Sequence, residues 1–414
     1  MRKELFSPVL FLAAAAVLIT AAALLASRER ASGRPALRRM EPLRIAVAAD
    51  LHYLSPALTD GGSYFTQVIT NADGKLMQYS DALTEAFADE IIRTQPDVLI
   101  LPGDLTFNGA RESHTALIEK LRRISDAGVR VLVMPGNHDL ENSMAASFHG
   151  DSFTRVDSVT QTEFAALYAP FGYGDALSRD EASLSYVSEI SPGLRVLLID
   201  TNTHDAPGAL KDETLRWAED ALKAAQADGA RVICVTHQTA LQHNSVFTDG
   251  FTIRGADALT ALLQRYDVRC TFCGHMHIQH LRTLGSLTEI AVSSLAVWPC
   301  QYGILDVNAD GGSFSTAAVD VPEVSGFAEQ AQAFFDANTL RQGSAAVSDA
   351  GDRDAMLEYL AQMNRGYYSG RMDAVQVDPT LQQAWEAADP FIAAYLRSLT
   401  EDAGQDFTQT AFTF

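Results

Sequence analysis

Cysteine, proline and basic residues are all scarce in this sequence. Its four cysteines, in 414 residues, are too few for a fold held together by disulfides. With 14 prolines and 47% hydrophobic residues, the composition excludes a proline-rich disordered chain and is typical of a globular protein. The 31 basic residues are outnumbered by 52 acidic ones, which gives a net charge of -21. This balance argues against a nucleic acid polymer as partner, because binding a phosphate backbone requires clustered Lys and Arg.

The N-terminus has a long uncharged apolar run. Residues 8–26, PVLFLAAAAVLITAAALLA, follow the basic start MRK and are long enough to cross a bilayer. We predict a signal anchor or a signal peptide over residues 1–27, and we favour an uncleaved anchor, although Ala21 and Ala23 offer a cleavage site. Residues 28–41 have the composition of a linker. We expect a membrane-anchored protein with its main domain outside the cytoplasm, or alternatively a secreted one.

Apolar strand-like runs alternate with helical patterns in the next part of the chain. The strands are predicted within residues 43–50, 96–104, 129–139, 194–201, 230–238 and 268–277. The helices are predicted within residues 80–94, 113–128 and 213–229, with Ser80 or Asp81 as an N-cap and Gly128 as a C-terminal stop. This alternation predicts a layered α/β core over residues 42–322. The Gly- and Ser-rich segment up to about residue 78 is predicted to be a long loop, and a lid over a site is one reading of it.

Residues 323–414 differ from the part before them. Three segments, at 323–340, 355–370 and 381–399, have helical spacing of apolar residues and are separated by Gly-, Ser- and Asp-rich joints. We predict a C-terminal helical domain. It either covers a site on the main domain and restricts substrate size, or mediates contacts between copies of the chain.

Polar residues follow five of the predicted strands, where open α/β sheets place their ligand sites. They are Asp50, Asp104, Asn137, His237 and His275, with His52 and His277 two residues beyond the first and the last. Carboxylate and amide oxygens together with imidazole nitrogens suit Mn, Fe or Zn. Seven ligands are too many for one ion but suit two divalent metal ions that share a bridging carboxylate. Such a pair binds a phosphoryl oxygen and lowers the pKa of a bridging water.

The segment GNHD, Gly136 to Asp139, adds a proton donor to this set. Asn137 is a predicted ligand, while His138 is placed to protonate a departing alkoxide. We expect Asp139 to orient and charge that imidazole, as carboxylates behind a histidine commonly do.

Five motifs together resemble those of the calcineurin-like metallophosphoesterases. They are DLH (50–52), GDLTFNG (103–109), GNHD (136–139), THQ (236–238) and GHMH (274–277). The resemblance covers about residues 43–320 and implies a four-layer α/β/β/α sandwich with two metal ions. It further implies that Asp50, His52 and His277 bind the first ion, that Asn137, His237 and His275 bind the second, that Asp104 bridges them, and that His138 is the general acid. Gln238 stands where the family often has a second histidine.

A narrower resemblance concerns the substrate. The segments DLHYLSPALTDGG and DGKLMQYSDALTEAF, with the helical tail, resemble membrane-anchored cyclic nucleotide phosphodiesterases of Gram-positive bacteria that carry a C-terminal helical bundle. This implies hydrolysis of cyclic nucleotides or similar small phosphodiesters. The alternatives are a phosphomonoesterase or a lipid-headgroup pyrophosphatase on the same site, and an inactive scaffold, against which the intact ligand set argues. The preferred cyclic phosphate, the native metal pair and the oligomeric state are left open.

Several cysteine, histidine and aromatic residues lie outside the predicted ligand set. Cys270 and Cys273 are three apart on a predicted strand and face opposite sides, so we expect buried small residues rather than a redox pair. His243 is a candidate for substrate contact. Tyr64 and Phe65, in the predicted loop, are candidates for stacking on a base. Trp217 and Phe334 are expected in the core.

Overall fold

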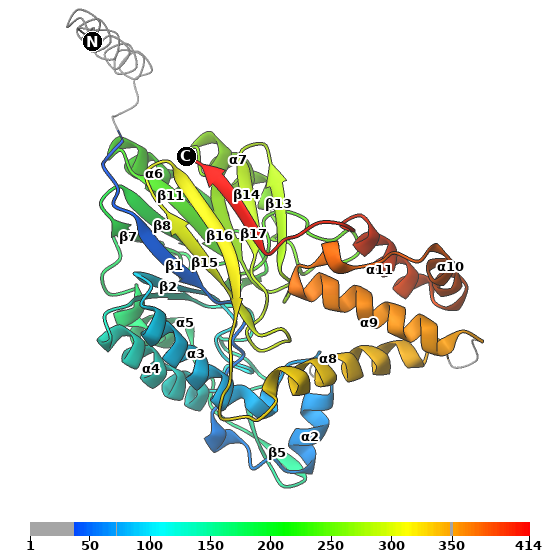
Figure 1. Cartoon of the computed structure of the whole chain (residues 1–414). Coiled ribbons are helices and arrows are strands. Elements are labelled where there is room, and N and C mark those ends of the chain that lie inside the picture. Colours follow the sequence, from blue (N-terminus) through cyan, green and yellow to red (C-terminus); the bar gives the residue numbers. More distant parts are fainter. Residues whose placement is uncertain (1–36, 72, 348–350) are drawn as a thin grey trace, which may run out of the picture.

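The computed structural model describes residues 37–71, 73–347 and 351–414 (Figure 1). The predicted signal anchor or signal peptide lies outside the described residues. Within them, no helix combines the length and the apolar character that crossing a membrane requires. The end of the predicted linker is part of the fold, because Met40 is buried in the main core and the Arg38 backbone N–H donates to the Gly229 carbonyl at 2.8 Å.

One sheet has the strand order β17-β16-β15-β1-β2-β3. The strand bounds are β1 Leu43–Val47, β2 Val98–Pro102, β3 Arg130–Met134, β15 Gln301–Val307, β16 Gly311–Ala318 and β17 Gln409–Thr413. β1, β2 and β3 are parallel, and β15 pairs antiparallel with β1, with Val47 opposite Gly303. The sequence of β2, VLILP, is buried at every residue, as expected for a parallel strand that is covered on both faces.

The other sheet has the order β13-β14-β12-β11-β8-β7-β6. Its strands are β6 Ser178–Arg179, β7 Tyr186–Ser191, β8 Leu194–Ile199, β11 Arg231–Thr236, β12 Cys270–Cys273, β13 His280–Leu284 and β14 Leu287–Ala291. β8, β11, β12 and β14 are parallel. Two short antiparallel pairs lie outside the sheets, β4 Ala146–His149 with β5 Ser152–Arg155, and β9 Asn202–Thr203 with β10 Ala206–Pro207.

Helices cover the outer faces of the two sheets (Figure 1). α3 Ser80–Thr94 and α4 Arg111–Asp126 pack against the β1-β2-β3 side, while α6 Asp212–Ala227 and α7 Ala256–Arg265 pack against the second sheet. α5 Gln161–Leu167 extends the first layer. The inner faces of the sheets share one core, in which Val47 and Ile100 join Leu198 and Val235. The predicted four-layer α/β/β/α sandwich is confirmed.

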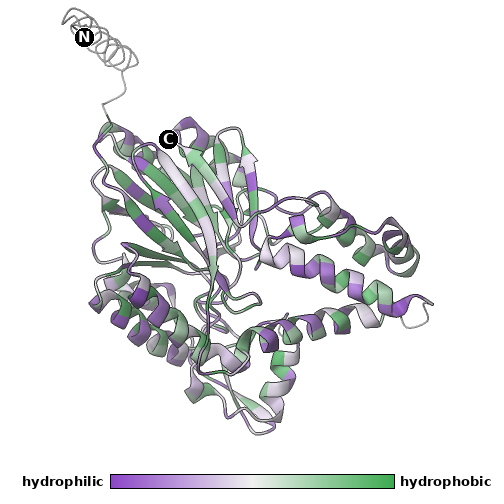
Figure 2. Cartoon of the chain, viewed as in Figure 1, coloured by the Kyte–Doolittle hydropathy of each residue, from purple (hydrophilic) through white to green (hydrophobic). Residues whose placement is uncertain are grey.

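The hydrophobic residues concentrate in the strands, as the colouring of Figure 2 shows. Full burial of one Val, Leu, Ile or Phe side chain contributes about 1.5–3 kcal/mol. The central strands have few polar side chains that would reduce this contribution. The stability from their burial offsets the cost of the polar groups that are buried at the strand ends.

The segment predicted as a loop between Tyr53 and Gln78 contains helical structure. α2 Ser63–Thr70 and the short 3-10 turns Pro56–Leu58 and Met77–Tyr79 interrupt it. Phe65 is buried and Tyr64 stacks on Phe148, so both rings belong to a small core under α2. The predicted N-cap is also wrong by one or two residues, because Tyr79 occupies that position and the Ser80 hydroxyl instead accepts from the Leu54 backbone N–H at 2.9 Å.

The C-terminal part leaves the sandwich as helices and then returns to it. The helices are α8 Phe327–Ser344, α9 Arg353–Ser369, α10 Pro379–Ala388 and α11 Pro390–Thr400. After α11, strand β17 pairs antiparallel with β16, with Phe314 opposite Thr410 (Figure 1). The segment predicted as a helical domain is therefore not helical to its end. The boundary at residue 322 stays a prediction.

A row of buried polar side chains joins the helices to the sandwich. Glu289 on β14 lies 3.1 Å from His243 Nε2, and His243 Nδ1 lies 3.0 Å from His280 Nδ1. His280 Nε2 in turn lies 3.0 Å from Asp402, which follows α11 and also pairs with Arg282 at 3.1 Å. His243 is 1% exposed and has a structural position, so the predicted contact with substrate is wrong.

Candidate metal centre

The predicted ligands lie at the carboxyl ends of strands from both sheets. The structure brings together Asp50 and His52 after β1, Asp104 after β2, Asn137 after β3, His237 after β11, and His275 and His277 after β12. β1, β2 and β3 run parallel in one sheet, as do β11 and β12 in the other, so these ends meet at one edge of the sandwich. All seven side chains are therefore neighbours, although they span more than 220 residues of sequence.

Left-handed backbone holds most of these residues in place. Asp50, His52, Asp104, His275 and His277 have φ between 42° and 66°. Non-glycine residues rarely adopt this conformation, and it costs on the order of 1–3 kcal/mol each. β1 ends at Val47, so the left-handed turns at Asp50 and His52, and not the alternation of a strand, direct both side chains toward the cluster.

Asp104 lies between two groups of side chains. In the first group, His52 Nε2 lies 3.8 Å from Asp104 Oδ2 and 3.0 Å from His277 Nε2, which is 3.9 Å from Asp50 Oδ1. In the second, His237 Nε2 lies 3.4 Å from Asp104 Oδ1 and 3.0 Å from Asn137 Oδ1. His275 completes the second group. A carboxylate with one oxygen toward each group is the arrangement that a bridging ligand needs.

Two glycines let the backbone approach these carboxylates closely. A Cβ at Gly136 would overlap the backbone and carboxylate of Asp104, and a Cβ at Gly274 would lie 2.6 Å from Asp50 Oδ2. Any larger residue would therefore displace a candidate ligand. This explains the glycine that begins each of the motifs GNHD and GHMH.

Backbone carbonyls fix the orientation of two of these imidazoles. His237 Nδ1 donates to the Pro102 carbonyl at 2.9 Å, and His275 Nε2 donates to the Gly250 carbonyl at 3.0 Å. In each ring the other nitrogen lies in the group around Asp104, where it binds a metal ion once it carries no proton. The rings are therefore already oriented for a cation, and His237 has to lose its second proton when a cation binds.

His138 lies beside the same carboxylate and is held from behind. Its backbone N–H donates to Asp104 Oδ1 at 2.8 Å, and its ring Nδ1 donates to the Phe107 carbonyl at 2.7 Å. Its Nε2 lies 3.9 Å from Asp104 Oδ2, and the side chain is 32% exposed. The free ring nitrogen thus faces the ligand cluster and is open to a substrate.

The predicted role of Asp139 in orienting His138 is wrong. The buried Asp139 carboxylate accepts hydrogen bonds from the backbone N–H groups of Gly136, Leu105 and Thr106, at 2.8 to 3.0 Å, and from the Thr106 hydroxyl. It therefore ties the loop after β2 to the loop after β3. The two residues are adjacent in sequence, but the turn directs their side chains to different partners.

Burial and charge set the protonation of the cluster. Burial lowers the pKa of His52 and His277 well below the usual range and that of His275 to about 4. Burial also acts to lower the pKa of His237, but Asp104 and Asp50 raise it to about 9. Burial acts to raise the pKa of Asp104, yet His237 and His138 hold it well below its usual value. Three of the histidines are therefore neutral at pH 7, which is the form that binds metal.

The donor set fits divalent metal ions. Two sub-clusters, Asp50/His52/Asp104/His277 and Asp104/His237/His275, each have ligand atoms within 4.8 Å of one another. Their mixture of imidazole nitrogen and carboxylate oxygen matches borderline cations. A cation also offsets the buried negative charge of Asp50 and Asp104.

A cavity of about 390 Å³ opens above the cluster. Its floor includes Asp104, Asn137, His138, His275 and His277. The opposite wall comes from α8, α9 and α11 of the C-terminal part, with Phe335, Asn338, Tyr368 and Tyr395 among its residues. Of the two predicted roles of the tail, the structure shows that it covers the site.

Sequence reasoning missed two residues near the cluster. Lys75 is 6% exposed, and burial lowers its pKa although Asp73, Asp104 and Asp50 act in the opposite direction. Asp73 lines the cavity. A lysine and an aspartate within a stretch interpreted as a loop were the available signal. Their position became evident only once the segment was seen to fold against the site.

Gln238 does not face the cavity. Its side chain is 2% exposed and forms hydrogen bonds with Thr201, at 2.6 Å, and with both side-chain atoms of Asn202. The residue that departs from the motif therefore supports the loop after β8. Cys270 and Cys273 are buried in different cores, as their spacing predicted.

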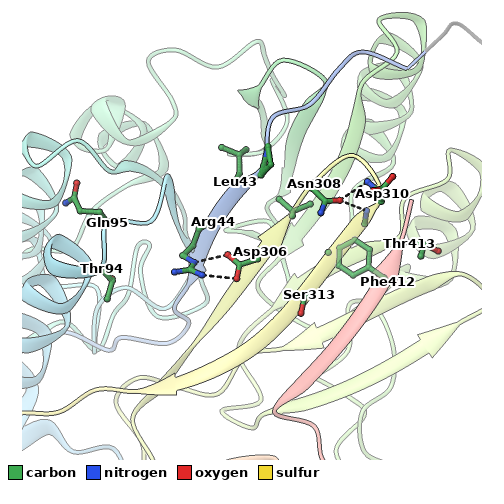
Figure 3. A pocket seen from close by; sticks show the side chains of 14 residues that line it. Leu43, Arg44, Thr94, Gln95, Asp306, Asn308, Asp310, Ser313, Phe412 and Thr413 are labelled. Atoms are coloured by element: carbon green, nitrogen blue, oxygen red, sulfur yellow. Dashed lines mark hydrogen bonds and ion pairs between the residues drawn. The ribbon is translucent and has the colours of Figure 1, made fainter. Parts of the chain in front are cut away.

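A hollow of about 630 Å³ lies at the other end of β1 (Figure 3). Its side chains include Arg44 and Asp306, which pair with each other at 2.7 Å. Arg44 stands at the amino end of β1, whereas the ligand cluster follows the carboxyl end of that strand. This larger hollow contains none of the predicted ligands and does not contribute to the site.

Comparisons with known proteins agree with the motifs. A family model described as calcineurin-like phosphoesterase matches residues 43–279, more than half of the chain. A probable cyclic nucleotide phosphodiesterase of Vesicomyosocius okutanii is 24% identical over 182 residues, or 44% of this chain and 62% of that protein. A probable glycerophosphodiester phosphodiesterase, GpdQ, of Arcobacter nitrofigilis is 23% identical over 222 residues, or 53% of this chain and 69% of that protein. The chain thus spans about two thirds of the length of these relatives.

Among solved structures, a dimetal phosphatase from Danio rerio is similar with a TM-score of 0.49 and 14% sequence identity. The similarity covers 68% of this chain and 98% of that one.

Proposed function

This chain belongs to the calcineurin-like phosphoesterase family, and we propose that it is a two-metal phosphodiesterase that hydrolyses cyclic nucleotides or similar small phosphodiesters. The observation that carries the proposal is the position of His138. Its free Nε2 borders a cavity of about 390 Å³ whose floor is the ligand cluster. A proton donor beside a cation site is what departure of an alkoxide from phosphorus needs.

The ligands divide into two sets around Asp104. Asp50, His52 and His277 would hold one divalent ion, Asn137, His237 and His275 the other, and Asp104 would bridge them. Mn, Fe and Zn all suit this donor set. When bound, the two ions supply positive charge for the phosphoryl oxygens and lower the pKa of a bound water.

His138 acts on the leaving group. The Phe107 carbonyl accepts the Nδ1–H at 2.7 Å and fixes the plane of the ring, so a second proton of the imidazolium sits on Nε2 and faces the cavity. Asp104 Oδ2 lies 3.9 Å from that nitrogen. Transfer of the Nε2 proton to the departing oxygen produces an alcohol and leaves the neutral imidazole.

The size of the cavity supports a small substrate. About 390 Å³ lies near the lower end of the range of about 300–1,000 Å³ that is usual for sites of small molecules. A single nucleotide matches this class, whereas a polymer would need an open groove and basic residues. The relatives named for cyclic nucleotide and glycerophosphodiester cleavage agree with a diester.

The test is hydrolysis of bis-p-nitrophenyl phosphate, p-nitrophenyl phosphate, 2′,3′-cyclic AMP and 3′,5′-cyclic AMP by the purified chain with Mn, beside His138→Ala. Metal-dependent cleavage of diesters that requires His138 is expected. Cleavage of the monoester alone would instead establish a phosphomonoesterase. No cleavage of any substrate in Mn, Fe or Zn would refute hydrolysis.

We also propose attachment to the membrane through residues 8–26, with the catalytic part outside the cytoplasm. The support is the uncharged apolar run after a basic start. Protease treatment of intact cells that produce the chain tests this, since a catalytic part outside the cytoplasm is digested while a cytoplasmic marker is protected. A protected catalytic part would refute the orientation.

A further inference from the structure

The cavity above the ligand cluster has a polar stripe on α8, where a helix that packs on a core is expected to be apolar. Phe335, Asn338, Thr339 and Gln342 all line the cavity. Their spacing of three, four and seven residues puts them on one face of the helix. Asn338 is half-buried and Gln342 is exposed, so both amides are accessible to a ligand in the cavity.

Two of the polar groups on this wall are already engaged with each other. The Asn364 amide nitrogen donates to the Thr339 hydroxyl at 3.1 Å, and its carbonyl oxygen accepts from the Tyr395 hydroxyl at 2.7 Å. Asn364 therefore holds α8, α9 and α11 together. These groups shape the wall and have little hydrogen-bonding capacity left for a ligand.

Asn338 and Gln342, unlike Thr339 and Asn364, have side-chain groups that form no hydrogen bond with the rest of the wall. The Asn338 carbonyl oxygen accepts from Arg341, but its amide nitrogen has no hydrogen-bond partner among the described residues. The Gln342 side chain has no hydrogen bond at all within the same part of the chain. Both line the cavity and retain free donors, and Gln342 also retains its acceptor.

Aromatic rings form an arc around the same space. From His275 the ring contacts run through Phe251 at 5.5 Å, Phe247 at 5.3 Å and Tyr395 at 5.5 Å. On the far side Phe335 and Tyr368 meet edge to face at 4.9 Å. Such walls accept a flat ring, because faces and edges of aromatic side chains both bind planar groups well.

We propose that the C-terminal helices form the binding subsite for the heterocyclic base of a nucleotide, with Asn338 and Gln342 as specificity-determining residues. The aromatic arc encloses the plane of the base, and the two amides form hydrogen bonds with its edge. The phosphodiester then lies over the ligand cluster on the opposite side of the cavity. This inference rests on the proposed phosphodiesterase function, whose general form does not require a base.

The test compares Asn338→Asp and Gln342→Ala with Gln332→Ala in the full chain. Asn338→Asp keeps the shape and the acceptor but removes the free donor. Gln332 is exposed on the same helix and does not line the cavity, so its variant is the matched control. Rates are measured with cyclic nucleotides of the four bases and with bis-p-nitrophenyl phosphate, which has aromatic rings but no base edge.

We expect each cavity variant to lower kcat/KM for the preferred nucleotide by about tenfold, which is the effect of one lost hydrogen bond. The ratio of kcat/KM between the preferred nucleotide and those with other bases should therefore decrease. Cleavage of bis-p-nitrophenyl phosphate should change by less than about twofold. Equal losses on all substrates, or no loss on any, would overturn the base subsite while leaving the hydrolase in place.

Binding of free nucleosides separates the subsite from the chemistry. Saturation-transfer NMR with adenosine, guanosine, cytidine and uridine should give signals with the wild-type chain that weaken in both cavity variants and persist in Gln332→Ala. This readout holds even if the wild-type chain cleaves no diester, an outcome that would reject the proposed function alone. Absence of nucleoside signals with the wild-type chain would reject the subsite.

Discussion

His138 donates its ring Nδ1–H to the backbone carbonyl of Phe107, 2.7 Å away, and not to the carboxylate of its neighbour Asp139. A carbonyl fixes the orientation of the imidazole without adding a negative charge behind it. The negative charge comes instead from Asp104, on the side of the ligand cluster. The proton donor and the loop-forming carboxylate are thus separate parts of one motif.

Replacing His138 by alanine should slow diester cleavage more for a basic leaving group, which has to be protonated as it departs, than for a weakly basic one. For a cyclic nucleotide, whose leaving group is an alkoxide, we expect a loss of about 10² to 10⁴ in kcat. For bis-p-nitrophenyl phosphate the loss should be much smaller, since p-nitrophenolate leaves as an anion. The measurement is the ratio of the two losses.

The matched control for that experiment is His204→Ala, because the His204 side chain is 76% exposed and does not line the cavity. It should retain wild-type rates. An equal loss on both substrates in His138→Ala would mean that His138 binds the phosphate rather than protonating the leaving group.

Asp139→Asn should destabilise the loops around the ligand cluster. The asparagine would present an N–H₂ group toward backbone N–H donors that now share a carboxylate, and we expect a loss of about 3 kcal/mol in the free energy of unfolding. Denaturant unfolding measures this, with Asp151→Asn at an exposed turn as control. The pH dependence of kcat should be the same in this variant as in the wild type. A variant of wild-type stability whose kcat depends differently on pH would support the orienting role of Asp139 after all.

Removing metal should abolish hydrolysis, and single ligand variants should remove ions separately. We expect the wild-type chain to bind close to two divalent ions, and both His52→Ala and His237→Ala to bind close to one, because they belong to different groups around Asp104. Asp104→Asn should weaken both sites. Elemental analysis after dialysis measures the content. One ion in the wild-type chain, or no loss in either histidine variant, would contradict a shared carboxylate.

Acidification should lower the free energy of unfolding because His280, which joins the C-terminal helices to the sandwich, becomes protonated. Burial lowers its pKa to about 4, despite the hydrogen bond to Asp402. The unfolded chain binds a proton at this histidine below about pH 6.5, whereas the folded chain does so only near pH 4, so stability falls as pH decreases between these values. The loss attributable to His280 is on the order of 3 kcal/mol.

The measurement compares urea unfolding of the metal-free chain at pH 7 and at pH 4.5, for the wild type and for His280→Gln. The glutamine variant should lose less stability on acidification than the wild type, whereas His149→Gln, at an exposed site, should behave as the wild type does. Identical acid sensitivity in all three chains would show that His280 does not titrate in this range.

Local patterns in the sequence were sufficient for the central strands, for the helices between them and for the identity of the cluster. Apolar runs such as VLILP predict strands because burial of Val, Ile and Leu determines strand positions, and polar residues just after them mark the sheet edge. Asp104 and His138 could be predicted in this way. Strand β17 could not, since QTAFT alternates weakly and becomes a strand only by pairing with β16.

The sequence by itself determined which residues could bind metal, the α/β layering and the helical character of the tail, because each depends on composition and spacing within one segment. The tertiary structure decided how those residues act. The left-handed turns at Asp50 and His277, the carbonyl behind His138 and the wall that α8 places over the cluster all arise from contacts between distant segments. Such contacts depend on how the sheets and helices pack, and no local pattern of residues specifies them.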